Sequence, residues 1–246
     1  MIALHDVGKK WQGEWVLRDV SLEISKGEYI GLIGPGGSGK TLLIKLMTGL
    51  VHPDAGTVTV DGQNLADLDA RGKEALRFRM GMLFQNFALF DFMTVAENLA
   101  FPLRQAGELE EAEIAGRIQT ALGEIGLSHA ADRYPIELSG GMKKRVSFAR
   151  AVIRRPPLLF YDDPTAGLDP VTSAKIFQLL TTIRETGDTT AVTAGHDLRG
   201  IRRLCDRVAM VGDGSIVHTG TIGEFDDCRR EPVASFWEAS RAEGWG

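Results

Sequence analysis

The segment YIGLIGPGGSGKT, residues 29–41, carries the clearest structural signal in the chain. Strand-like residues from Tyr29 to Ile33 lead into a glycine-rich loop, and the residues after Lys40-Thr41 have the apolar spacing of a helix. The loop fits the pattern G-x-x-x-x-G-K-[ST], in the strand–loop–helix setting that this pattern needs. Backbone N–H groups of such a loop point at phosphate oxygens, and the helix N-terminus adds partial positive charge. The segment therefore predicts a nucleotide-phosphate site at the end of a β-strand.

Two side chains at the end of this loop have separate predicted roles. Lys40 is expected to reach the β- and γ-phosphates and to assist catalysis, and the Thr41 hydroxyl is placed to hold Mg²⁺. The residues of the loop that we predict to bind ATP are Gly34, Pro35, Gly36, Gly37, Ser38, Gly39, Lys40 and Thr41.

A pair of aspartates supplies the acidic groups that this chemistry needs. Asp162 and Asp163 follow the apolar run 157–161, which predicts a buried strand directly beside the strand that leads into the loop. Asp162 is then placed to reach the metal through water, and Asp163 to accept a proton from an attacking water. The alternative is an Asp-Asp-Pro turn in which the carboxylates only cap a helix.

Composition narrows the class of protein. The chain has 246 residues, 43% hydrophobic and 25% charged, and a formal net charge of −5, which argues against sequence-independent nucleic-acid binding. The start of the chain lacks the apolar segment of a signal peptide, and no run approaches about 18 apolar residues. We expect a soluble, cytosolic chain without a membrane span of its own. From the two cysteines, Cys205 and Cys228, we expect neither a metal site nor a disulfide framework.

Strand and helix patterns alternate along the chain, which favours an α/β core. Asp61-Gly62 predicts a hairpin turn, and the helical region from about 100 to 157 is interpreted as an insertion into the core. The run of positive charge at Lys143, Lys144 and Arg145 indicates a helix face that is exposed to solvent. The expected strands are 2–7, 16–24, 29–33, 56–61, 82–84, 157–162, 189–193 and 208–211, and the expected helices are 42–50, 109–125, 171–186 and 197–205.

A second anion-binding element lies at Leu138-Ser139-Gly140-Gly141-Met142. A simple nucleotide kinase has no need of it, so a kinase function does not explain this segment. Two phosphate-binding elements in one chain suggest that each nucleotide is held between two copies of the protein.

Six elements in a fixed order resemble the nucleotide-binding domains of ABC transporters. They are the glycine-rich loop, Gln85, Leu138–Gly141, Asp162-Asp163, Gly167-Leu168-Asp169 and His196. The resemblance implies an α/β fold with a P-loop NTPase, ABC-type ATPase core: a mostly parallel sheet with helices on both faces and an N-terminal antiparallel β subdomain. An α-helical subdomain, about 87–157, would be inserted in a single domain spanning 1–246, with a C-terminal extension at 226–246.

The resemblance assigns several residues to one nucleotide site. Asp162 would be the metal-binding Walker B aspartate, and Asp163 the catalytic base. Gln85 would sense Mg²⁺ and the γ-phosphate, as a metal-binding and catalytic residue. His196 would be the catalytic switch histidine near the γ-phosphate, and Trp11 would stack on adenine.

Other residues would serve the nucleotide held by a second copy. Ser139, Gly140 and Gly141 would bind the γ-phosphate of ATP on the opposite subunit, and Asp169 would cross the dimer seam. The cofactors implied are ATP and Mg²⁺. The partners implied are a second copy of the chain and integral-membrane permease subunits, with the protein peripheral on the cytoplasmic face of the inner (cell) membrane.

Three positions depart from the family pattern. Met142 stands where the family usually has Gln, and Ala194-Gly195 precedes the histidine. Asp163 stands where the family usually has the catalytic glutamate. Because aspartate is one methylene shorter and catalysis is sensitive to displacements of about 1 Å, we expect slow but real hydrolysis.

The cargo is predicted from the segment Phe84–Val95 and its continuation to Leu103. These residues, Met142 and the tail Pro232–Phe236 resemble the ATPases of MCE/Mla-type phospholipid transporters. Phe87, Phe90, Phe92 and Met93 could form an apolar groove for a helix of a membrane partner. The alternatives are the ATPase of a polar amino-acid or other small-solute importer, which shares much of this segment, and a soluble non-transport ABC ATPase.

Overall fold

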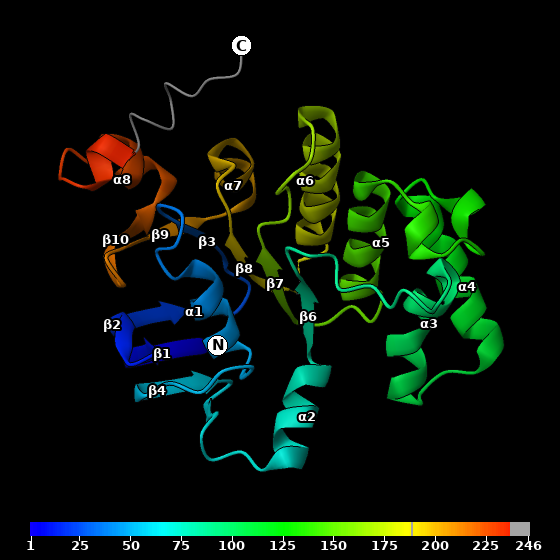
Figure 1. Cartoon of the computed structure of the whole chain (residues 1–246), viewed down its shortest axis with the longest axis horizontal. Helices are drawn as coiled ribbons and strands as arrows, with labels where there is room; N and C mark the ends of the chain where they lie inside the picture. The colour runs from blue at the N-terminus through cyan, green and yellow to red at the C-terminus, as the bar shows by residue number, and fades with distance from the viewer. Residues whose placement is uncertain (188, 237–246) are drawn as a thin grey trace.

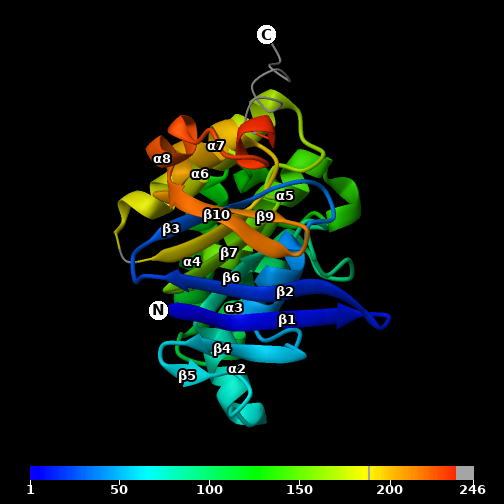
Figure 2. The same ribbon diagram turned by 90° about the vertical axis from the view of Figure 1, so that its left-hand side faces the viewer.

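Two β-sheets lie one above the other, with helix α1 (Lys40–Met47) packed between them (Figures 1 and 2). The structure is a computed structural model that describes residues 1–187 and 189–236. The smaller sheet is antiparallel, in the order β2-β1-β4-β5. Its strands are β1 (Ile2–Trp11), β2 (Glu14–Ile24), β4 (Ala55–Val60) and β5 (Gln63–Asn64).

The larger sheet carries the glycine-rich loop. Its six strands have the order β10-β9-β3-β8-β7-β6, and all neighbours are parallel except β10 and β9. The strands are β3 (Tyr29–Ile33), β6 (Met80–Leu83), β7 (Leu158–Asp162), β8 (Thr190–Ala194), β9 (Arg207–Gly212) and β10 (Ser215–Thr221).

One predicted neighbour relation is wrong. Strand β7 does not lie beside β3, because β8 is inserted between them. Alternation of strands and helices predicts parallel strands but does not fix their order across the sheet. The register still brings the two functional ends level, since Ala194 of β8 is opposite Leu32 on one side and Asp162 on the other.

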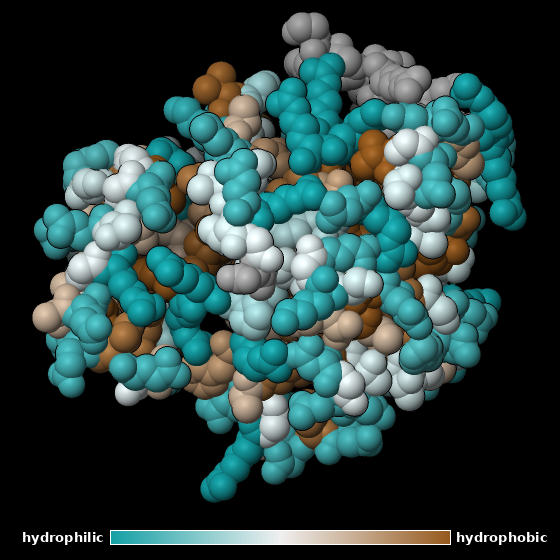
Figure 3. Space-filling view, turned by 180° about the vertical axis from the view of Figure 1, so that it is seen from behind, coloured by the Kyte–Doolittle hydropathy of each residue, from teal (hydrophilic) through white to brown (hydrophobic). Residues whose placement is uncertain are grey.

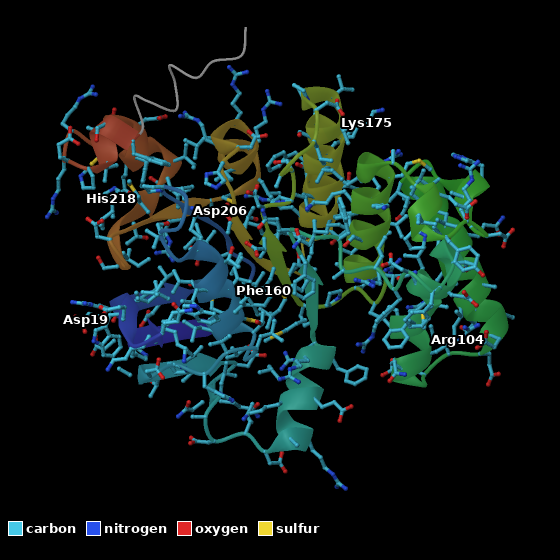
Figure 4. All side chains as sticks on the ribbon, viewed as in Figure 1. Asp19, Arg104, Phe160, Lys175, Asp206 and His218 are labelled. Atoms are coloured by element: carbon cyan, nitrogen blue, oxygen red, sulfur yellow. The ribbon has the colours of Figure 1, made fainter. Side chains whose placement is uncertain are left out.

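Side chains of the larger sheet alternate between two cores. Phe160, near the centre of the molecule in Figure 4, and Leu158 pack toward α1 and the smaller sheet. Leu159 and Tyr161 point to the opposite face, which helices α5 (Gly140–Val152), α6 (Pro170–Glu185) and α7 (Leu198–Leu204) cover. Burial on both faces explains the nearly continuous apolar run of β7.

The residues between β6 and β7 are mainly helical and stand beside the sheet (Figure 1). Helix α3 (Val95–Ala106) begins at a capping box formed by Thr94 and Glu97, and α4 (Glu111–Glu124) precedes α5. Two short 3₁₀ segments, Ser128–Ala130 and Pro135–Glu137, connect α4 to α5. These helices pack on one another and on the face of the larger sheet that α6 and α7 cover.

Some elements were not predicted from sequence. They are α2 (Ala70–Phe78), α8 (Ile222–Asp227) and the edge strand β10, whereas α3 begins a few residues before the predicted helical region. The Asp61-Gly62 turn is confirmed: both residues have positive φ, 52° and 76°, and they join β4 to β5. Of the predicted C-terminal extension 226–246, residues 237–246 lie outside the described part.

The face in Figure 3 is mostly hydrophilic, with hydrophobic residues in small separate groups. Within the described ranges, no helix combines the length and the apolar character needed to cross a membrane.

Candidate functional site

The glycine-rich loop takes a backbone path that only glycine permits at two points. Gly34 has a φ of 135°, and a Cβ there would lie 2.1 Å from the Val211 carbonyl oxygen. Gly39 has a φ of 106° and would place a Cβ 2.6 Å from Leu17. Both conformations are disfavoured for other residues, so the glycines allow the loop to turn tightly between β3 and α1.

Next to this loop, at the carboxyl ends of β7 and β8, lies a cavity of about 520 Å³. Parallel α/β sheets bind ligands at this edge. The cavity brings together most of the residues predicted for one nucleotide site. Its lining includes Trp11, Gly37, Ser38, Gly39, Lys40, Thr41, Gln85, Asp162, Asp163 and His196.

The Lys40 side chain is buried and bound to its own loop. Its Nζ donates to the carbonyl oxygens of Gly34 and Pro35, each at 2.8 Å, and lies 3.5 Å from Ser38 Oγ. Burial lowers the pKa of Lys40, and the nearby carboxylates of Asp163 and Asp162 oppose that change. Gly34 and Pro35 do not line the cavity, but through these bonds they hold the ammonium group in place.

The donor set beside Lys40 suits a magnesium ion. Thr41 Oγ1 donates to Asp162 Oδ1 at 2.8 Å, so a hydroxyl and a carboxylate oxygen meet at the cavity. Gln85 is exposed and adds an amide side chain to the lining. Mg²⁺ prefers oxygen ligands and is usually bound by one or two protein groups together with water and substrate phosphates. Among the described residues, no group of three or more His, Cys, Asp or Glu side chains has an arrangement that could hold a metal ion.

Asp163 occupies a left-handed turn directly after β7. Its φ is 47°, a conformation that aspartate tolerates, and its N–H donates to the Ala194 carbonyl oxygen at 2.8 Å. His196 follows β8, and its Nε2 lies 3.9 Å from Asp163 Oδ2. Burial raises the pKa of Asp163; electrostatic interactions with His196, Lys144 and Lys40 lower it, whereas Asp162 raises it further.

Trp11 lies at the rim of the cavity. It ends β1 in a tight hairpin whose turn residues, Gln12 and Gly13, both have positive φ. Its side chain is 61% exposed, so a broad aromatic surface is free beside the loop.

Like Gly34 and Pro35, Gly36 of the loop does not line the cavity, and neither do four predicted site residues from other segments. Ser139 caps α5 and its Oγ accepts from the Met142 N–H at 3.3 Å; Gly140 and Gly141 form the first turn of that helix. Asp169 caps α6 and accepts from the backbone N–H groups of Val171 and Thr172, each at 3.0 Å. The structure therefore separates the predicted residues into a cavity group and a group at two helix N-termini.

The predicted solvated face of α5 is wrong for Lys144. This side chain is fully buried, and its Nζ donates to the carbonyl oxygens of Phe84, Gln85 and Asp163. Burial lowers the pKa of Lys144, against the effect of Asp163 and Asp162. Helical spacing would have revealed it, because Lys144 precedes the buried Ser147 and Phe148 by three and four residues.

Comparison with known proteins decides the family. Residues 17–166 match the family model described as ABC transporter. The chain belongs to the ABC transporter family. As a member of that family it is an ATPase, and its fold is the ABC ATPase fold expected from sequence.

One curated relative of this ABC ATPase is the methionine import ATP-binding protein MetN 2 of Pseudomonas aeruginosa (strain UCBPP-PA14). It is 42% identical over 228 residues, which are 91% of this chain and 68% of the relative. About a third of the relative's length therefore has no counterpart in the match. Its name describes a small-solute importer rather than the phospholipid transporter predicted from the Phe84–Val95 segment.

Two solved structures have the same fold. One is the dimeric, post-hydrolysis state of the ATP-binding cassette MJ0796 bound to ADP and Pi, with 33% identity and a TM-score of 0.83 over 90% of this chain and 99% of the other. The second is cbiO1 from Clostridium perfringens, part of the ABC transporter complex cbiONQ. It is 29% identical, with a TM-score of 0.81 over 92% of this chain and 90% of the other.

Replacement of Lys40 by alanine should weaken ATP binding at least about tenfold, because a charge-assisted contact to phosphate contributes about 1.5–3 kcal/mol. Isothermal titration calorimetry with ATP measures the effect. The matched control is Lys26→Ala, an exposed lysine before β3, which should bind ATP as the wild type does. Equal affinity of the Lys40→Ala variant and the wild type would exclude the predicted phosphate contact.

Proposed function

We propose that this ABC ATPase is the energy-supplying subunit of an importer for a small polar solute, with methionine as the first candidate. The match to MetN 2 over 91% of the chain supports this cargo class better than lipid transport. The observation that supports hydrolysis is the convergence of Lys40, Thr41-Asp162 and Asp163-His196 on one cavity.

Each side chain of the cavity has a distinct task in our proposal. The loop amides and Lys40 bind the phosphates, and Trp11 stacks on adenine. Asp163 accepts a proton from the attacking water, and His196 lies beside it toward the γ-phosphate. Thr41, Asp162 and Gln85 would hold Mg²⁺, which when bound neutralises charge that develops on the phosphates.

The proposal includes a homodimer with two composite sites. Ser139, Gly140 and Gly141 lie at a helix N-terminus outside the cavity of their own chain, where backbone N–H groups can receive an anion. We propose that they bind the γ-phosphate of ATP on the partner, and that Asp169 lies at the seam. ATP would then favour the closed dimer and its hydrolysis the open one, because only ATP makes both contacts.

A permease is the second proposed partner. Behind Gln85, Phe90 packs against Phe92 and Phe101, with ring centroids 5.8 Å and 4.9 Å apart. Phe92 is 75% exposed, which supports docking of an apolar helix from a membrane subunit at this loop. The protein would thus be peripheral, on the cytoplasmic face of the cell membrane.

The same aromatic cluster supports the second candidate cargo. Its residues belong to the segment that resembles MCE/Mla-type ATPases, so phospholipid transport is the alternative function. Deletion of the gene in the source organism distinguishes the two. Loss of labelled methionine uptake with unchanged phospholipid distribution between membranes supports the importer, and the opposite result supports the lipid transporter. Complementation by the wild-type gene, but not by an Asp163→Asn gene, would attribute either effect to hydrolysis.

Asp163→Asn should lower the kcat for ATP hydrolysis at least about a hundredfold, because the amide cannot accept the proton. ATP-dependent dimerisation should remain. Asp213→Asn is a matched control, since Asp213 has the same φ of 47° but is exposed in the β9–β10 turn. Phosphate release measures turnover, and unchanged turnover in Asp163→Asn would disprove the role of Asp163 as base.

Ser139→Arg should block ATP-dependent dimerisation while leaving ATP binding to the monomer within about twofold of the wild type. The large side chain fills the anion site at the N-terminus of α5. Light scattering in the Asp163→Asn background detects the dimer without loss of ATP to hydrolysis. Ser128→Arg, at an exposed position of the helical region, controls for the added charge. Normal dimerisation of Ser139→Arg would disprove the composite site.

A further inference from the structure

The loop that carries Gln85 is held by one face of α5. Between β6 and α3, residues 84–90 form no helix or strand, and Phe87 and Ala88 both have positive φ. Lys144, Ser147 and Arg150, spaced by three residues on α5, donate to main-chain carbonyl oxygens along this loop. The conformation of the loop therefore depends on side chains of the helix that Ser139 caps.

Lys144 makes the most contacts of the three. Its Nζ lies 3.3 Å from the Phe84 oxygen, 3.1 Å from the Gln85 oxygen and 3.2 Å from the Asp163 oxygen. The ammonium also lies 5.5 Å from the centroid of the Phe87 ring. An ammonium group has three donors, so all three are used.

A buried lysine is a costly choice for packing alone. Desolvation of the charge is unfavourable, and an apolar side chain of similar length would fill the same volume at lower cost. The lysine instead binds two loops to one ammonium group. One loop follows β6 and the other follows β7.

We propose that Lys144 is a positioning residue for ATP hydrolysis, which fixes Gln85 and Asp163 relative to each other and to the N-terminus of α5. Lys144 does not line the cavity, and it acts through the main chain of those two residues. This inference rests on the proposed function. In the proposed dimer, α5 contacts the partner's ATP at its first turn and holds the hydrolytic residues of its own site one turn later.

The consequence is a connection between the two composite sites within each chain. When α5 moves on binding the partner's nucleotide, the carbonyl groups of Gln85 and Asp163 move with the helix. Hydrolysis then depends on closure of the dimer even for nucleotide that is already bound.

The primary test compares Lys144→Met with Lys144→Arg. Methionine keeps the length but removes all three donors, and a misplacement of about 1 Å can lower the rate about a hundredfold. We expect the kcat of Lys144→Met to fall between about tenfold and a hundredfold, with the Kd for ATP within about twofold of the wild type. Arginine retains charge and donors and should keep at least about a third of the wild-type kcat. The control is Lys175→Met, an exposed lysine of α6 labelled in Figure 4, which should behave as the wild type.

Hydrogen–deuterium exchange without nucleotide provides a readout that does not depend on hydrolysis. Amides of residues 84–90 should exchange at least about threefold faster in Lys144→Met than in the wild type, and at the wild-type rate in Lys175→Met. Ser147→Ala removes the contact to the Phe87 oxygen and is a milder change. The Ser147→Ala variant should show faster exchange and a kcat lowered about threefold. If Lys144→Met does not fold, this variant tests the proposal in its place.

Any of three results would overturn the inference. The first is a wild-type kcat in Lys144→Met, or in Ser147→Ala if only that variant folds, and the second is unchanged exchange over residues 84–90. A fall in ATP affinity equal to the fall in kcat/KM would also contradict it, because positioning for hydrolysis spares binding. A wild-type protein that fails to hydrolyse ATP would instead disprove the proposed function, and the exchange rates would still report on the Lys144 contacts.

Discussion

The hydrogen bond from Thr41 to Asp162 joins two segments that are 121 residues apart in sequence. It exists because β3 and β7 flank the same strand, with Leu32 of β3 and Asp162 of β7 both opposite Ala194. Slippage of β7 by one residue would turn its side chains to the opposite face and move the carboxylate from the loop. The register of the larger sheet is thus the constraint on which the cavity depends, and the two apolar cores that bury both faces of the sheet hold that register.

Charge in and around the cavity alternates in sign over short distances. Lys40 lies beside Asp162 and Asp163, and Lys144 supports the turn at Asp163 from the side of α5. Both ammonium groups are bound mainly by backbone carbonyl oxygens, so their positions are set by the main chain rather than by flexible acidic partners. Fixed dipoles of this kind need little reorganisation when charge moves, which favours catalysis of phosphoryl transfer.

Sequence patterns predicted the parts of this structure that depend on local chemistry. The glycine-rich loop, the buried run of β7 and the Asp61-Gly62 turn follow from residue type and spacing, and the carboxyl edge of a parallel sheet explains why residues from four segments share a cavity. The order β3-β8-β7 could not be read in this way, because no local pattern encodes which parallel strand lies between two others. The burial of Lys144 does not follow from its residue type, because lysine is usually exposed; only its position on the helix, three residues before the buried Ser147, indicates it. The predicted phospholipid cargo differs from the methionine named for the relatives, because the Phe84–Val95 segment is shared between subfamilies.

The left-handed turn at Asp163 also bears on how this position can change over evolutionary time. Aspartate, asparagine and glycine adopt that backbone readily, whereas other residues incur about 1–2 kcal/mol. Of these three, only aspartate has a carboxylate. If Asp163 is the base, as proposed, substitutions that fit this backbone would give proteins that fold and bind nucleotide but no longer hydrolyse it. A single substitution that leaves this backbone unchanged could thus convert a descendant of this chain into a protein that binds nucleotide without hydrolysing it.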